Sequence, residues 1–218
     1  MLIRAGYDIT YQFTQPTPMI LALNIHYSRA NDVVRPDNLT LEPAVPTVAY
    51  RDGFGNWCTR LVAPPGRLRL RADALVRDSG VPEPIVSDAL QHSVQNLPDE
   101  VLVYLLPSRY CESDQLSETA WSLFGHTPLG WARVQAVCDY VHQHLTFGYA
   151  YANVYRTAAQ AFQERRGVCR DFAHLGIAFC RALNIPARYC TSYLGDIGVP
   201  QMPEPMDFSA SFEAYLGG

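Results

Sequence analysis

The residues that could carry chemistry gather in one stretch, RRGVCRDFAHLGIAFCRALNIPARY, which runs from Arg165 to Tyr189. Gly167 ends one segment, and an apolar helical pattern then runs from Cys169 to Asn184. A cysteine at a helix N-terminus lies beside free backbone N–H groups and a partial positive charge, which favour a thiolate and can hold an oxyanion. Cys169 is therefore a candidate nucleophile, provided that the chain also supplies a base.

The same geometry serves a purely structural interpretation of Cys169. At 100° per residue, Phe172, Ala173, Gly176 and Cys180 share its face of the helix, so the thiol lies at the end of an apolar stripe. A buried cysteine usually behaves as a small hydrophobic residue. Composition and geometry alone favour this structural interpretation.

A histidine base is hard to find from spacing. His174 lies five residues after Cys169, which places it about 140° around the helix and out of easy reach of the thiol. His142 and His144 are two residues apart and face different sides of their helix, so they make a poor metal pair, and we expect solvent-facing or capping roles for them. No histidine follows His174.

Helices are expected to position the cysteine in the second half of the chain. Asp114 is expected to cap a short helix that ends at Gly125. Thr127 and Pro128 then supply an N-cap followed by proline, which predicts the start of a second helix. The apolar face of that helix is formed by Trp131, Val134, Cys138, Val141 and Leu145.

A third helix and two strands are expected to complete this half. The helix precedes the cysteine; it opens with a capping box at Thr157 and Gln160 and ends by Gly167. After the cysteine helix, ARYCTSYL and FSASFEAYL alternate as strands do, and the Pro/Gly-rich segment GDIGVPQMPEPMD separates them. The order of elements therefore predicts helices packed on an antiparallel sheet.

The first half has the period-two pattern of antiparallel strands. Apolar residues alternate with polar ones in the stretches that begin at Ile3 and Met19, and again in RLRLRADAL from Arg67. The sequence DGFGN at 52–56 marks a tight turn. We predict an α+β protein in which a small β-sandwich at residues 1–85 precedes the helix-plus-sheet domain at residues 86–218.

Composition excludes several classes of partner. The 218 residues carry 17 Lys+Arg against 21 Asp+Glu, a net charge of −4, with no basic run that would follow a phosphate backbone, so nucleic acid is not expected. No window approaches 18 consecutive apolar residues, so no membrane span is expected. The N-terminus reads as a strand and not as a signal peptide.

The cysteine count points to free thiols. Six cysteines are scattered without a CxxC pair, so neither a disulfide framework nor a zinc site is predicted, and no D-x-D-x-D-G calcium loop occurs. We therefore expect a cytoplasmic protein that needs no metal or other cofactor. The cysteines are Cys58, Cys111, Cys138, Cys169, Cys180 and Cys190.

The segments GVCRDFAHL at 167–175 and FCRALNIPARY at 179–189 resemble the transglutaminase-like superfamily of bacterial cysteine acyl-transfer enzymes. The resemblance extends upstream through LTFGYAY and TAAQAFQERR, and the first half resembles the β-rich N-terminal region that accompanies this domain in bacteria. It implies a papain-like arrangement: a cysteine at a helix N-terminus, a histidine on a following strand, and an Asp or Asn on the next strand. Cys169 matches the nucleophile of this arrangement. With the resemblance included, we favour the interpretation of Cys169 as a nucleophile over the purely structural one.

The other two positions of the implied triad differ in this chain. In MDFSASFEAYLGG, Ser209 stands where the resemblance implies histidine and Ser211 where it implies tryptophan, and the chain ends at Gly218 before the segment that would carry the third member. We expect the domain to be incomplete at its C-terminus. Serine does not ionise near neutral pH and cannot cycle a proton as imidazole does.

The resemblance implies acyl transfer on a peptide or protein amide substrate. In this hypothesis Cys169 attacks the carbonyl and its own backbone N–H contributes to the oxyanion hole. Water as the second substrate would make the protein a protease or amidase, which we favour, and an amine would make it a transglutaminase. Activity is expected to be weak because Ser209 replaces the histidine. The alternative is an inactive binding or scaffolding protein with the same fold, and a homo-oligomer remains open.

Overall fold

The computed structural model describes residues 1–195, 200 and 207–217. The chain divides into two compact units, Met1–Glu83 and Pro84–Gly218. Most of the expected loop GDIGVPQMPEPMD lies outside the described residues. No helix in the described part of the chain is both long and apolar enough to cross a membrane.

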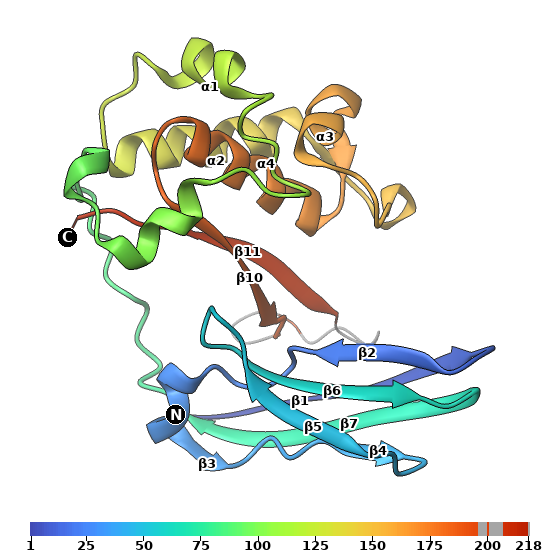
Figure 1. The fold of residues 1–218 in the computed structure, drawn as a ribbon. Coiled ribbons are helices and arrows are strands. Elements are labelled where there is room, and N and C mark those ends of the chain that lie inside the picture. The colour runs from blue at the N-terminus through green and yellow to red at the C-terminus, as the bar shows by residue number, and fades with distance from the viewer. Residues whose placement is uncertain (196–199, 201–206, 218) are drawn as a thin grey trace. The chain divides into compact units, whose positions relative to one another are not determined.

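The first unit is a sandwich of two antiparallel sheets (Figure 1). In one sheet β7 pairs with β1, β3 and β4, and in the other β6 lies between β2 and β5. The alternation in the sequence places Leu21, Leu61, Ala63, Leu68 and Leu70 in a shared core, which contains side chains from both sheets. The strands and one 3-10 helix are β1 Leu2–Phe13, β2 Thr17–Leu21, η1 Tyr27–Asp32, β3 Val33–Arg35, β4 Thr40–Glu42, β5 Thr47–Arg51, β6 Trp57–Ala63 and β7 Gly66–Arg77.

The turn that joins β5 to β6 follows from its residue types. The Asp52 carboxylate accepts hydrogen bonds from the backbone N–H groups of Phe54 and Asn56, and Gly55 has a φ of 87°. An Asx turn with glycine in the left-handed region reverses the chain within five residues. The tight turn predicted from DGFGN is therefore confirmed.

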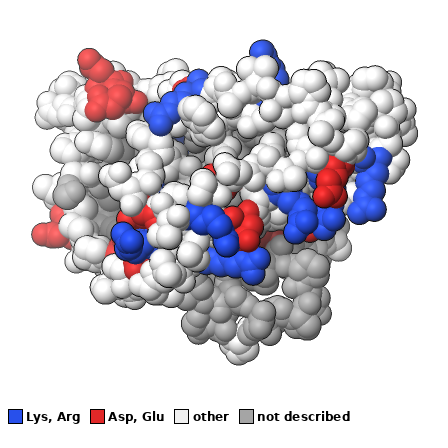
Figure 2. All heavy atoms as spheres, turned by 90° about the horizontal axis from the view of Figure 1, so that it is seen from below, with Lys and Arg blue, Asp and Glu red and all other residues white. Residues whose placement is uncertain are grey.

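Arginines and acids are paired on the β1–β7 sheet. Asp73 accepts from Arg4 and Arg35, and Asp8 from Arg69, at distances of 2.6–2.8 Å. Figure 2 shows acidic and basic side chains interleaved on the face that it draws, rather than separated into blocks of one sign. Such paired and exposed charges add little stability.

The second unit packs four helices and a two-stranded antiparallel ribbon around a separate core (Figure 1). The most buried helix, α4, lies against the β10–β11 ribbon. Two short 3-10 helices precede the first α-helix of this unit. The elements are η2 Val94–Asn96, η3 Asp99–Leu105, α1 Ser117–Phe124, α2 Trp131–His144, β8 Thr146–Phe147, η4 Tyr149–Tyr151, α3 Ala158–Glu164, β9 Arg166–Gly167, α4 Cys169–Ala182, β10 Ala187–Tyr193 and β11 Phe208–Ala214.

The start of α2 corrects one prediction. The Thr127 hydroxyl does not cap a helix at Pro128; it donates to the Phe124 carbonyl at 2.7 Å and so closes the preceding helix. The N-cap of α2 is Gly130, whose φ of 88° suits glycine, and the helix begins at Trp131. Likewise α1 ends at Gly125 as predicted, but it begins at Ser117, and Asp114 lies in the turn before it.

The elements around Cys169 agree with their local signals. The capping box at Thr157 and Gln160 is present, and α3 ends at Glu164, followed by Arg165 as its C-cap in the left-handed conformation. The helix α4 spans Cys169–Ala182, close to the predicted end. Strands β10 and β11 pair along their whole length, from Ala187 opposite Ala214 to Tyr193 opposite Phe208.

Candidate active site around Cys169

Cys169 is the first residue of α4 and is half-buried. Strands β8 and β9 pair in parallel, with residues 146–147 beside residues 166–167. This pairing fixes the backbone just before α4 begins. The first backbone N–H groups of a helix have no partner within the helix. The thiol and its own N–H are thus placed where an incoming carbonyl group could meet both.

Asp171 holds the turn that precedes the cysteine. Its carboxylate accepts from the Val168 N–H at 2.8 Å and from the Arg156 guanidinium at 3.1 Å. The side chains of Asp171 and Arg156 are 0% and 5% exposed, so this is a buried ion pair. Of the two hydrogen bonds of a capping box, only the one from the Val168 N–H to Asp171 forms here. The other cannot form, because the side chain of the N-cap residue Val168 has no acceptor atom. An acid at the third helix position is a sequence signal from which this contact could have been predicted, and we missed it.

Gly167 is required by the same contact. A Cβ atom at this position would lie 2.5 Å from both Cβ and Oδ2 of Asp171. The glycine therefore lets the backbone approach the buried carboxylate, which in turn fixes the residue before Cys169.

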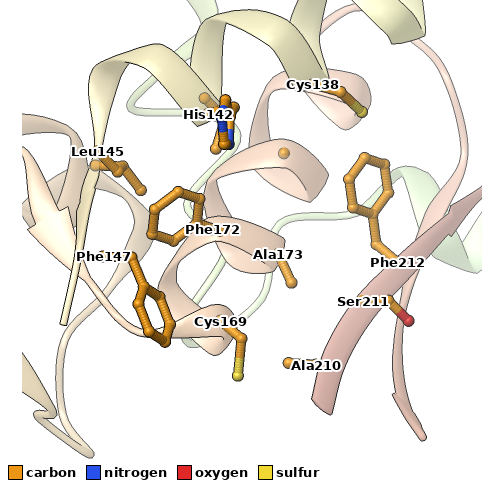
Figure 3. A pocket seen from close by; sticks show the side chains of 12 residues that line it. Cys138, His142, Leu145, Phe147, Cys169, Phe172, Ala173, Ala210, Ser211 and Phe212 are labelled. Carbon is orange, nitrogen blue, oxygen red and sulfur yellow. The ribbon is translucent and has the colours of Figure 1, made fainter. Parts of the chain in front are cut away.

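A cavity of about 610 Å³ opens beside Cys169 (Figure 3). Helix α2 and the segment after it contribute Cys138, Val141, His142, Leu145 and Phe147. Helix α4 contributes Cys169, Phe172, Ala173 and Gly176, and β11 contributes Ala210, Ser211 and Phe212. Three residues of the apolar face predicted for α2, Cys138, Val141 and Leu145, therefore contribute to one wall of the cavity.

Ser209, the second residue singled out from the sequence, lies in β11 opposite Ser192 and is not among the residues that line this cavity. The next residue, Ala210, does line it beside Cys169 (Figure 3). Successive side chains in a strand point to opposite faces. The structure thus brings Cys169 and Ala210 to one cavity and places Ser209 on the other face of the strand.

His174 is buried away from the cavity. Its ring is 6% exposed, stacks on Tyr110 with centroids 5.4 Å apart, and contacts Tyr189 at 5.1 Å. Burial, with the charges of Arg170 and Arg181, lowers the pKa of His174 to about 4. The histidine is therefore neutral near pH 7, and its position agrees with the expectation that it does not serve the thiol.

The two histidines of α2 face different sides of the helix, as expected, but the solvent-facing or capping role expected for His144 is wrong. His144 contacts the Phe162 carbonyl through Nε2 at 2.7 Å and stacks between Tyr140 and Phe162, so it joins α2 to α3. His142 is exposed and lines the cavity on the side of α2. The position of His142 on this wall was not anticipated, because it depends on how α2 packs against α4.

Comparison with known proteins agrees with this arrangement. Residues 119–218 match the family model of the transglutaminase-like superfamily. A crystal structure named "Putative Cysteine Protease", from Cytophaga hutchinsonii, is 32% identical; the match covers 100% of this chain and 76% of that one, with a TM-score of 0.82.

A second relative is an uncharacterized protein of Mycobacterium leprae, 27% identical over 159 residues. The match covers 70% of this chain, which spans 56% of the length of that curated relative. The sequence motif, the mixed helical and antiparallel fold and these similarities agree, and the chain belongs to the transglutaminase-like superfamily.

Proposed function

We propose that Cys169 is a thiol nucleophile that takes an acyl group from a peptide or amide substrate. The observation that carries the proposal is the placement of the thiol at the N-terminus of α4, open to the cavity and held by the buried Asp171–Arg156 pair. Helix N-termini activate thiols and bind developing oxyanions in many enzymes. The name of the Cytophaga hutchinsonii relative supports the same chemistry.

The proposed reaction has two steps. The sulfur bonds to the carbonyl carbon, the carbon–nitrogen bond breaks, and the thiol proton leaves with the amine. Water then cleaves the thioester to release an acid, or an amine takes the acyl group instead. We favour water as the acceptor. The first step needs a group that carries the proton to the leaving amine, and Ser209 supplies no imidazole for it.

An activated ester tests the nucleophile separately from this proton transfer. p-Nitrophenolate leaves as a stable anion, so p-nitrophenyl acetate can acylate a thiol without an acid. All 17 basic side chains are arginine, so no lysine amine competes for the acetyl group. We expect Cys169 to be acetylated at pH 7 at least tenfold faster than the thiol of N-acetylcysteine, with the site located by peptide mass spectrometry.

Two variants serve as controls for this test. Cys169→Ser should lose the fast reaction, and Cys138→Ser, which removes another thiol of the same cavity, should keep it. An acetyl group spread over several cysteines, or a rate equal to that of N-acetylcysteine, would contradict the proposal.

A second candidate function is binding without turnover. It is favoured by the residues that β11 presents to the cavity, Ala210, Ser211 and Phe212, none of which ionises near neutral pH. In that case the cavity would hold a ligand, and Cys169 would react no faster than an ordinary thiol. The ester experiment therefore distinguishes the two candidates.

A further inference from the structure

The cavity extends well beyond the thiol. The lining residues of α4 run from Cys169 to Gly176, seven helical steps that span about 10 Å. Those of α2 run from Cys138 to His142, and Leu145 and Phe147 of the following segment extend the same wall. The cavity volume of about 610 Å³ lies within the range of small-molecule pockets, roughly 300–1,000 Å³. It is far larger than the volume that a methyl group would occupy.

The walls of the cavity are apolar and partly aromatic. Phe147, Phe172 and Phe212 all line it, and the first two rings lie with their centroids 6.2 Å apart at an angle of 58°. Aromatic rings pack well against further rings in tilted or edge-to-face arrangements. The lining therefore suits an aromatic occupant.

Polar groups are few among the described residues of this lining. His142 lies on the α2 wall, and Ser211 contributes to the opposite wall while its hydroxyl points away from the cavity (Figure 3). A carboxamide or carboxylate placed against Phe172 and Ala173 would lose its hydrogen bonds to water without replacement. The cavity thus disfavours a glutamine-like or charged group.

We propose that this cavity binds an aromatic side chain of the acyl donor while the donor's carbonyl carbon lies at the Cys169 sulfur. This inference rests on the proposed function and adds the chemical class of the donor to it. The selected substrate is an acyl group with a large apolar ring, and a small or charged acyl group gains nothing from the cavity.

A series of p-nitrophenyl esters tests the inference on the unaltered protein. The esters are acetate, 3-phenylpropanoate and 3-(4-carboxyphenyl)propanoate, and each rate at Cys169 is divided by the rate of the same ester with N-acetylcysteine. Burial of a phenyl group is expected to raise this ratio at least about tenfold for 3-phenylpropanoate over acetate. The carboxylated ring, which is charged and slightly larger, should show no such gain.

Matched variants place the preference in the cavity. Ala173→Phe puts a ring into the space and should abolish the preference for 3-phenylpropanoate. Ala152→Phe makes the same change at an exposed position that does not line the cavity, and should leave the preference intact. Thermal melting of both variants shows whether each is folded.

A protection experiment needs no variant. Saturating 3-phenylpropanol should slow the alkylation of Cys169 by iodoacetamide at least threefold, and propanol at the same concentration should not. If acetate acylates Cys169 rapidly but the normalised ratios of the three esters are equal, the inference is wrong and the proposed function stands. If no ester reacts faster at Cys169 than with N-acetylcysteine, the proposed function fails, and the protection experiment alone decides whether the cavity binds an aromatic group.

Discussion

At the scale of single residues, Cys169 depends on neighbours that do no chemistry themselves. Asp171 and Arg156 form a buried pair, and breaking such a pair by removing one partner leaves an uncompensated charge. One oxygen of Asp171, Oδ1, has no hydrogen-bond partner among the described residues. The position of this buried carboxylate therefore depends on the hydrogen bonds that its other oxygen, Oδ2, accepts from Arg156 and the Val168 N–H.

The buried His174 makes stability depend on pH. Its pKa in the folded state is lowered to about 4, whereas an unfolded histidine has a pKa near 6.5. At a pH between these two pKa values, His174 binds a proton in the unfolded chain but not in the folded chain. Stability from this residue is thus fully present above pH 6.5 and is lost as the pH falls toward 4.

His174→Phe should remove this dependence, because phenylalanine can stack on Tyr110 and does not titrate. Between pH 7 and pH 5 the free energy of unfolding of the natural chain should fall by about 2 kcal/mol more than that of the variant. Urea denaturation at both pH values measures the difference. Parallel pH profiles for the two proteins would show that His174 is not the source.

An imidazole on β11 beside the thiol should supply the proton transfer that Ser209 cannot. The resemblance implies histidine at position 209, but the strand alternation puts that position on the face of β11 opposite Ala210. Ala210 lines the cavity together with Cys169, so an imidazole at position 210 would share the space onto which the thiol opens. We expect Ala210→His to hydrolyse a peptide p-nitroanilide at least about tenfold faster than the natural chain.

Ser209→His is the matched control, because it puts the same ring on the face of β11 that is turned away from the cavity. It should not gain activity. A gain for Ser209→His alone would mean that β11 presents its faces to the thiol in the opposite sense.

At the scale of elements, the junction between β9 and α4 sets the position of the nucleophile. Gly167 closes β9, Val168 caps α4, and the Asp171 carboxylate returns to the Val168 N–H. The backbone is therefore fixed on both sides of the point where Cys169 begins its helix.

Gly167→Ala should disrupt this junction, since its Cβ would meet Asp171 at 2.5 Å and displace the carboxylate from Arg156. We expect a loss of about 3 kcal/mol in the free energy of unfolding and a slower acetylation of Cys169. Gly53→Ala is the control: its Cβ would meet nothing within 4 Å, so stability should change by less than about 0.5 kcal/mol. Equal stability of the two variants, measured by urea denaturation, would argue against a role for this contact.

At the scale of the whole molecule, each unit has its own apolar core. Buried residues of the sandwich centre on Leu68 and Leu70, and those of the second unit include Leu175 and Phe179. Cys169, the buried Asp171–Arg156 pair and all residues that line the cavity belong to Pro84–Gly218. The residues of the proposed chemistry therefore all belong to the second unit.

Patterns among residues close together in the sequence predicted many of the helices and strands of this protein. Alternation predicted the long strands, the Thr157–Gln160 capping box predicted the start of α3, and the apolar period predicted α4 from Cys169. These predictions succeed because each depends on residues within a few positions of one another. The start of α2 was missed, because the Thr127 hydroxyl donates to the Phe124 carbonyl instead of capping a helix at Pro128.

Only the tertiary structure decided which residues share the site. Cys138 and His142 reach the cavity of Cys169 because α2 packs on α4, and Arg156 reaches Asp171 because of how α3 and the turn before it lie against that helix. The stacking of His174 on Tyr110 likewise joins α4 to a segment far earlier in the chain. Such contacts arise from packing between distant segments, and local periodicity carries no information about them.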